Sequence, residues 1–108
     1  MYKENRSAHR YNFVASAEIE CYGVLRDGRV TDLCIHGCYL AMLEPFSKGS
    51  LVLVKIRTNR EFFQSHGRVA HSSFGIGMGL KFEGVSPPFQ LVLQEWLISA
   101  LRPVEVRK

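Results

Sequence analysis

The segment GIGMGLKFEGVSPPFQLVLQEWLISAL, residues 75–101, changes its hydrophobic period near the middle. Its first part has an apolar side chain at every second position, which is typical of a strand with one buried face. These side chains are Ile76, Met78, Leu80 and Phe82. After Ser86 and Pro87, which suit the N-cap and the first position of a helix, the apolar spacing becomes three and four. The segment therefore predicts a strand followed by a helix over about residues 87–101.

The same segment has two features that its hydrophobic periodicity alone does not explain. The second face of the strand carries Gly75, Gly77, Gly79 and Lys81. Bare glycines on one strand face predict a bulge, a sharp bend, or a close approach by a ligand or another backbone. In the helix, Leu91 and Ile98 lie off the apolar stripe, so the helix either has a broad apolar face or contacts a partner there.

Upstream of this segment, alternating apolar and polar residues predict five more strands. They cover about residues 13–21, 29–35, 38–43, 51–57 and 62–71. Asp27-Gly28 is the expected hairpin turn before the second of these strands. That strand should alternate strictly, with Leu33 on one face and Val30 and Asp32 on the other. The fold expected is therefore dominated by β-structure: a six-stranded antiparallel β-barrel with a C-terminal α-helix.

Length and composition place the chain among small globular domains. It has 108 residues, of which 46% are hydrophobic and 22% charged. This size supports one core, which excludes a large enzyme with its own substrate domain, and the apolar content excludes a disordered chain. No apolar run approaches the roughly 20 residues of a membrane span. The charged N-terminus is not followed by the apolar core of a signal peptide, so we expect a cytoplasmic protein.

The cysteines and the net charge give weaker indications. Three cysteines are an odd number, and reduced thiols are expected in a cytoplasmic protein. Cys34 and Cys38, with His36 between them, lack a second Cys/His pair at zinc-ligand spacing, so we expect neither a metal site nor a cofactor. The net charge of +4 favours anionic partners, although a solvated basic surface would explain it equally well.

Two short motifs carry the candidate chemistry. Arg6 and Arg10 lie four residues apart in a polar N-terminal arm, and Asp32, Cys34 and Gly37 span a strand and the turn after it. Taken singly, each has a simple structural interpretation: a solvated tail, a turn cap, a small buried thiol, or a backbone with positive φ.

Together and in this order, the motifs resemble those of the PilZ domain family, bacterial receptors for the second messenger cyclic di-GMP. The family combines an RxxxR arm with a [D/N]xSxxG strand and turn on a six-stranded barrel. Here Arg6 and Arg10 match the first motif, Asp32 and Gly37 match the second, and Cys34 occupies the serine position. The resemblance implies an arm over residues 1–11, a barrel with its helix over 12–102, and a tail over 103–108.

The resemblance also implies a binding site for cyclic di-GMP. Its contacts would be Arg6, Arg10, Asp32, Cys34 and Gly37, with Asn5 and Gly79 as further candidates. A guanidinium can pair with a phosphate or stack on a purine, and a carboxylate can accept the guanine N1–H and N2–H. A thiol in place of a hydroxyl should cost on the order of 1 kcal/mol, so we expect nucleotide binding to survive. Arg68 and Lys81 could also contact phosphate, although a solvated face explains both.

The expected function is a receptor or adaptor module without enzymatic activity. The nucleotide would order the N-terminal arm and change a surface that an unknown downstream protein reads. The alternative is a PilZ-fold interaction module that does not bind the nucleotide, which Cys34 favours. A nucleic-acid-binding barrel should have a row of exposed aromatic residues, but Phe62 and Phe63 are adjacent and point to opposite faces. No nucleophile with a base and an orienting group can be named, so we expect no enzyme.

Overall fold

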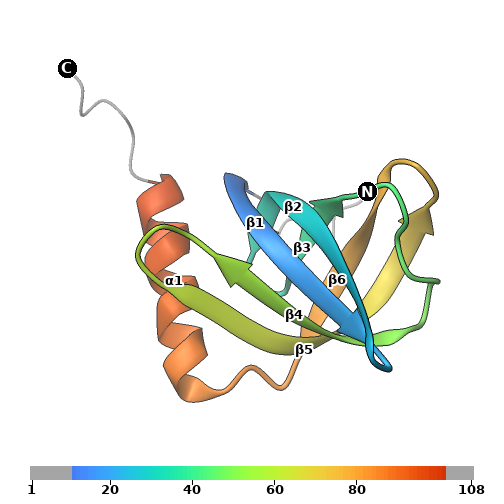
Figure 1. Cartoon of the computed structure of the whole chain (residues 1–108). Coiled ribbons are helices and arrows are strands. Elements are labelled where there is room, and N and C mark those ends of the chain that lie inside the picture. The colour runs from blue at the N-terminus through green and yellow to red at the C-terminus, as the bar shows by residue number, and fades with distance from the viewer. Residues whose placement is uncertain (1–10, 102–108) are drawn as a thin grey trace, which may run out of the picture.

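The computed structural model describes residues 11–101, which form six strands and one helix. The elements are β1 (Tyr11–Cys21), β2 (Val24–Cys34), β3 (Gly37–Ala41), β4 (Leu51–Arg57), β5 (Phe62–Ser73), β6 (Gly77–Glu83) and α1 (Pro87–Leu101). All neighbouring strands are antiparallel, and they close a barrel in the order β1-β2-β3-β6-β5-β4 (Figure 1). The predicted six-stranded barrel with a C-terminal helix is confirmed.

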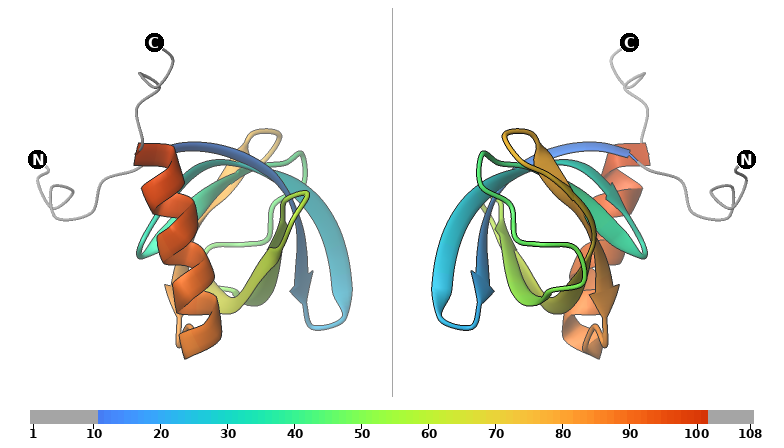
Figure 2. Two further views of the ribbon diagram at one scale, coloured as in Figure 1. Left: turned by 90° about the vertical axis from the view of Figure 1, so that its left-hand side faces the viewer. Right: turned by 90° about the vertical axis from the view of Figure 1, so that its right-hand side faces the viewer.

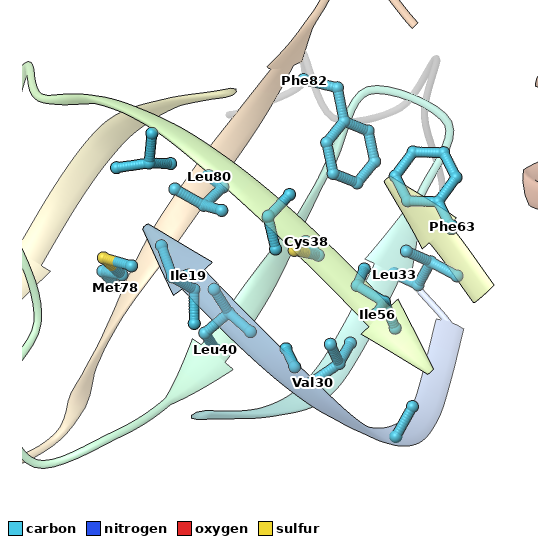
Figure 3. Close-up of a cluster of buried hydrophobic side chains, with 14 of the residues drawn as sticks. Ile19, Val30, Leu33, Cys38, Leu40, Ile56, Phe63, Met78, Leu80 and Phe82 are labelled. Carbon is cyan, nitrogen blue, oxygen red and sulfur yellow. The ribbon is translucent and has the colours of Figure 1, made fainter. Parts of the chain in front are cut away.

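Alternating side chains from all six strands fill the barrel. Residues i and i+2 of a strand face the same side, so each strand contributes its apolar set to one interior. Figure 3 shows these side chains meeting from opposite walls. The largest fully buried ones are Ile19, Leu33, Leu40, Ile56, Phe63 and Met78, with Leu93 of α1. Burying an aliphatic or aromatic side chain contributes about 1.5–3 kcal/mol, so this interior is the main source of stability.

Helix α1 packs against one end of the barrel, as Figures 1 and 2 show. Its Trp96 ring stacks on Phe13 with centroids 5.1 Å apart, and its indole N–H donates to a carboxylate oxygen of Glu61 at 3.1 Å. The helix has the predicted bounds. Leu91 and Ile98 are exposed, so neither belongs to the face that covers the barrel. Within residues 11–101, no helix has the length and apolar character needed to cross a bilayer.

The predicted turn at Asp27-Gly28 is wrong. The chain reverses at Tyr22-Gly23, where φ is 49° and 85°, and Asp27 and Gly28 lie inside the 11-residue strand β2. Left-handed backbone at both central residues is what a tight two-residue hairpin requires, and Gly23 adopts it without steric cost. Asp27 and Gly28 instead pair with β1, because both strands continue past them. The favourable turn sequence was overridden by pairing along the whole hairpin.

The strict alternation predicted for β2 is also wrong. The register between β2 and β3 shifts between Val30 and Asp32. An extra residue at such a bulge changes which face the following side chains take. Val30 and Leu33 are therefore both buried, although strict alternation would put them on opposite faces.

The glycines of β6 mark close approaches, one of the predicted explanations. A Cβ at Gly77 would collide with the carbonyl oxygen of Leu40, and one at Gly79 would lie 3.1 Å from the His71 ring. The predicted apolar face is confirmed at Met78, Leu80 and Phe82, which are buried. It is wrong at Ile76, which lies in the turn before β6 and is 64% exposed.

Candidate functional site

An open pocket of about 430 Å³ lies where the β2–β3 hairpin meets β5 and β6. Four of the predicted contact residues line it: Asp32, Cys34, Gly37 and Gly79. Its other lining residues are Leu33, His36, Cys38, Tyr39, Ala70, His71, Leu80 and Lys81. The structure thus brings the described part of the predicted site into one pocket.

Strand register explains why these residues meet. Asp32 pairs with Tyr39, Tyr39 with Gly79, and Gly79 with His71, which makes one row across β2, β3, β6 and β5. Directly paired residues on neighbouring strands have side chains close enough to interact. The row therefore sets a carboxylate at one side of the pocket and an aromatic pair at the other.

A second row runs beside the first across the same four strands. Cys34 pairs with Gly37, Gly37 with Lys81, and Lys81 with Arg68. Lys81 is exposed and lines the pocket. The Arg68 guanidinium is engaged elsewhere, by a Glu83 carboxylate oxygen at 3.0 Å and the Gly49 carbonyl at 3.2 Å. Of the two further phosphate candidates, Lys81 is the one that faces the pocket.

The rings of Tyr39 and His71 meet over Gly79. Their centroids are 5.8 Å apart and their planes differ by 33°. A Cβ on Gly79 would lie 3.1–3.2 Å from His71 ring atoms and 3.8 Å from Cδ1 of Tyr39. Because Gly79 has no side chain, the two rings can occupy the space next to it. Aromatic rings on a pocket wall suit a planar base.

The neighbouring backbone leaves no room for a side chain at Gly37. An ideal Cβ there would overlap the carbonyl oxygen of Leu80 in β6. The neighbouring turn is held to the same strand, because the amide of Phe82 donates to the carbonyl of His36 at 2.8 Å. The glycine of the second motif thus lets the β2–β3 hairpin lie tightly against β6.

The two cysteines of this hairpin have different environments. Cys34 is half-buried at the pocket, whereas Cys38 is packed in the core (Figure 3). Burial raises the pKa of the Cys38 thiol, and the nearby Cys34 raises it further. Cys21, Cys34 and Cys38 form no disulfide. Within residues 11–101, the structure gathers no group of three His, Cys, Asp or Glu side chains suited to a metal ion.

Three predicted contact residues lie outside the described part of the chain: Asn5, Arg6 and Arg10. The described chain begins at Tyr11, which pairs with Leu33, and Asn12 pairs with Asp32. The polypeptide that carries the RxxxR motif therefore enters the barrel beside the Asp32 position. Whether the arginines contact a ligand stays a prediction.

Sequence reasoning missed Tyr39 and His71 as pocket residues. Neither belongs to a motif, and His71 lies 32 residues beyond Tyr39 in the chain. Only the register of β3, β6 and β5 brings their rings together. The row of glycines in β6 was the one sequence signal for a close approach at this place.

Solved structures with the same architecture include a PilZ domain and two structures with cyclic di-GMP. The PilZ domain of CeSA from a cellulose-synthesizing bacterium matches 87% of this chain and 99% of its own, with TM-score 0.69 and 16% identity. The PilZ domain of YcgR from Escherichia coli with cyclic di-GMP matches 91% of this chain and 92% of its own, with TM-score 0.76 and 15% identity. YcgR from Escherichia coli in complex with cyclic di-GMP matches 95% of this chain and 48% of its own, with TM-score 0.79 and 18% identity.

At these identities the structural likeness shows a shared fold. No curated protein is significantly similar to the chain. The family profile of the PilZ domain, however, matches residues 4–99, a range that includes both motifs and nearly the whole barrel and helix. The chain therefore belongs to the PilZ domain family.

Proposed function

We propose that this chain is a receptor for cyclic di-GMP and binds it in the pocket between the β2–β3 hairpin and strands β5 and β6. The observation that carries the proposal is the row of paired residues in which Asp32 lies beside Tyr39, whose ring meets that of His71 over Gly79. The ligand has two guanines and two phosphates, and the row offers an acceptor and an aromatic surface for a base. The cyclic di-GMP complexes of similar fold support this ligand.

The described residues suit distinct parts of the nucleotide. The Asp32 carboxylate can accept the N1–H and N2–H of guanine, which adenine lacks at those positions. The rings of Tyr39 and His71 can stack on a base. The exposed ammonium of Lys81 can approach a phosphate. Arg6 and Arg10 would supply the bidentate contacts that hold the phosphates or guanine O6 and N7.

Signalling would follow from ordering of the N-terminal arm. The arm joins β1 beside Asp32, so a ligand bound there can be held by the barrel and by Arg6 and Arg10 together. Binding would then change a surface that a separate protein reads, which makes the chain an adaptor in the bacterial cytoplasm. The proposal includes no chemical conversion of the nucleotide.

Titration calorimetry of the purified chain with cyclic di-GMP tests this proposal, with GTP and cyclic di-AMP as controls. We expect micromolar or tighter binding of cyclic di-GMP alone. Asp32→Ala and Arg10→Ala should each weaken it at least about tenfold, since each removes a charge-assisted contact. Asp27→Ala, which removes a carboxylate from the same strand outside the pocket, should leave the affinity unchanged.

The second candidate function is a protein-interaction module that does not bind the nucleotide. The observation in its favour is Cys34, which offers the pocket a weak hydrogen-bonding thiol in place of a hydroxyl. Under the receptor proposal, Cys34→Ser should bind several-fold more tightly than the native chain. Absence of heat with both the native chain and Cys34→Ser would reject the receptor and leave this second function.

A further inference from the structure

Strands β2, β1 and β4 lie side by side in the barrel wall (Figure 1), and their outer face carries a cluster of arginines. Ser16 of β1 pairs with Arg29 of β2 on one side and Arg57 of β4 on the other, and all three are exposed. Because neighbouring strands lie about 4.8 Å apart, the two arginine Cα atoms are about 10 Å apart across Ser16. Arg60, from the β4–β5 turn, lines the same hollow as Ser16 and Arg57. We call Val14, Ser16, Arg29, Arg57 and Arg60 the arginine face.

The guanidinium groups of the arginine face have no partner within the described chain. Those of Arg29, Arg57 and Arg60 form no ion pair or hydrogen bond with any residue from 11 to 101. The other described arginines are both engaged: Arg68 pairs with a carboxylate, and Arg26 donates to a carbonyl and lies over a phenyl ring. The positive charge of this face is therefore available to an anionic partner.

The surface around Ser16 is hollowed on both sides of β1. A hollow of about 560 Å³ lies toward β4, and one of about 360 Å³ lies toward β2. Both share Val14, which is 68% exposed beside the bulge between Asn12 and Ala15. Arginine is enriched in protein interfaces, and an exposed apolar side chain beside it adds surface that a partner can bury.

The charges next to this face restrict how a partner can lie on it. In the next outward-facing row, Glu18 of β1 pairs with Asp27 and with Lys55. An acidic segment would be attracted to the arginine row and repelled by Glu18 and Asp27, which fixes its position. The aromatic residue opposite Arg57 is Phe62, whose ring already contacts Phe89 and the Lys55 ammonium. The face thus offers no free aromatic platform for stacking the bases of a nucleic acid.

We propose that the arginine face docks an acidic segment of a partner protein, with carboxylates on Arg29, Arg57 and Arg60 and an apolar side chain on Val14. It shares only β2 with the nucleotide pocket, and its strand β1 continues from the N-terminal arm. The surface could therefore serve the proposed receptor as the site read by its partner. Docking itself does not require the nucleotide, so the two proposals can fail separately.

Fluorescence anisotropy with the full chain and no nucleotide tests the docking surface. The probe is a fluorescein-labelled peptide of Glu-Glu-Leu repeats, with a Lys-Lys-Leu peptide and a single-stranded oligonucleotide as comparisons. We expect saturable binding of the acidic peptide that weakens as salt is added. The Arg29→Ala/Arg57→Ala double variant should bind about tenfold more weakly. Arg68→Ala, which removes a single charge of the same residue type from an outward-facing part of β5, should stay within about twofold.

A map of the binding site completes the test. In amide NMR spectra, the acidic peptide should shift the resonances of residues 14–16, 29 and 57–60. Thermal unfolding should show that the double variant remains folded. The proposal is overturned by an absence of saturable binding, by an equal loss in Arg68→Ala, or by shifts confined to other strands. Tighter binding of the oligonucleotide than of the acidic peptide would also overturn it and assign the face to nucleic acid.

Discussion

Gly37 illustrates how one residue connects the barrel and the pocket. It is one of the three defining positions of a sequence motif, yet in the structure its constraint is steric, because a Cβ would overlap the carbonyl oxygen of Leu80. The absence of a side chain lets β3 lie against β6 and brings the β2–β3 hairpin to the pocket. A motif residue can therefore support a site without contacting its ligand.

Gly37→Ala should destabilise the chain by about 1–3 kcal/mol, because backbone must move to relieve the overlap. Urea unfolding followed by tryptophan fluorescence measures the change. Gly28→Ala is the matched control, since an added Cβ there would meet its nearest atoms at an ordinary 3.4–3.5 Å. A Gly37→Ala variant as stable as Gly28→Ala would contradict the steric explanation.

Cys38 predicts a dependence of stability on alkaline pH. Burial raises the pKa of this thiol in the folded chain above the ordinary value of 9.0. The stability that it contributes is therefore complete below about pH 9 and is lost as the pH rises, since the unfolded thiol ionises first. The free energy of unfolding should fall by up to about 1.4 kcal/mol per pH unit for this group.

Comparison with Cys38→Ala isolates that contribution. Above pH 9, the native chain should lose stability more steeply than Cys38→Ala, whereas Cys34→Ala, at the half-buried position, should keep the steep loss. Denaturant midpoints at a series of pH values provide the measurement. Parallel pH profiles for the native chain and Cys38→Ala would show that burial of this thiol has no such effect.

At the scale of elements, helix α1 is attached to the barrel mainly by aromatic side chains. Trp96 stacks on Phe13, lies 6.3 Å from Phe63 between ring centroids, and donates to Glu61. These contacts join the helix to β1, to β5 and to the residue before β5. The side of the helix that faces away from the barrel carries exposed apolar residues, including Leu91 and Ile98.

Trp96→Ala should therefore lower the free energy of unfolding by about 3–5 kcal/mol, the usual cost of removing a large buried aromatic group. Ile98→Ala, on the same helix but exposed, should change it by no more than about 0.5 kcal/mol. Urea unfolding followed by far-ultraviolet circular dichroism, which needs no tryptophan, measures both. Similar losses in the two variants would mean that the helix is not held through Trp96.

The elements also show how far the sequence alone could lead. The spacing of apolar residues predicted six strands and a helix because side-chain direction follows directly from local backbone geometry. They did not predict the bulge after Val30, since one extra residue in a strand leaves almost no trace in an apolar pattern. Asp27-Gly28 was misassigned because a local turn preference can be outweighed by pairing along both strands.

The candidate site likewise contains residues that the sequence could identify and residues that it could not. Asp32, Cys34 and Gly37 are close in the chain, so their motif could be recognised from spacing. Tyr39 and His71 could not be, because their proximity depends on which residues of β3, β6 and β5 pair. Register is decided by the packing of the whole barrel, which no short segment contains.

At the scale of the molecule, the receptor proposal predicts stabilisation by the nucleotide. A ligand that binds only the folded chain adds RT ln(1 + [L]/Kd) to its stability, about 2.7 kcal/mol at a hundredfold excess over Kd. Cyclic di-GMP should raise the thermal midpoint by several degrees, whereas GTP should not. Asp32→Ala should reduce the shift to about half or less at the same ligand concentration, and Asp27→Ala should keep it.

The closure of the barrel also limits how a partner can recognise this domain. Every strand pairs with a neighbour on both sides over part of its length, and the described chain leaves only short stretches of edge open, such as residues 24–28 of β2, which pair with β1 alone. A partner can add a strand of its own through backbone hydrogen bonds, a common means of peptide recruitment, only along such short stretches. Recognition of the rest of the barrel must therefore read side chains, and its specificity can change through surface substitutions without altering the backbone framework beneath them.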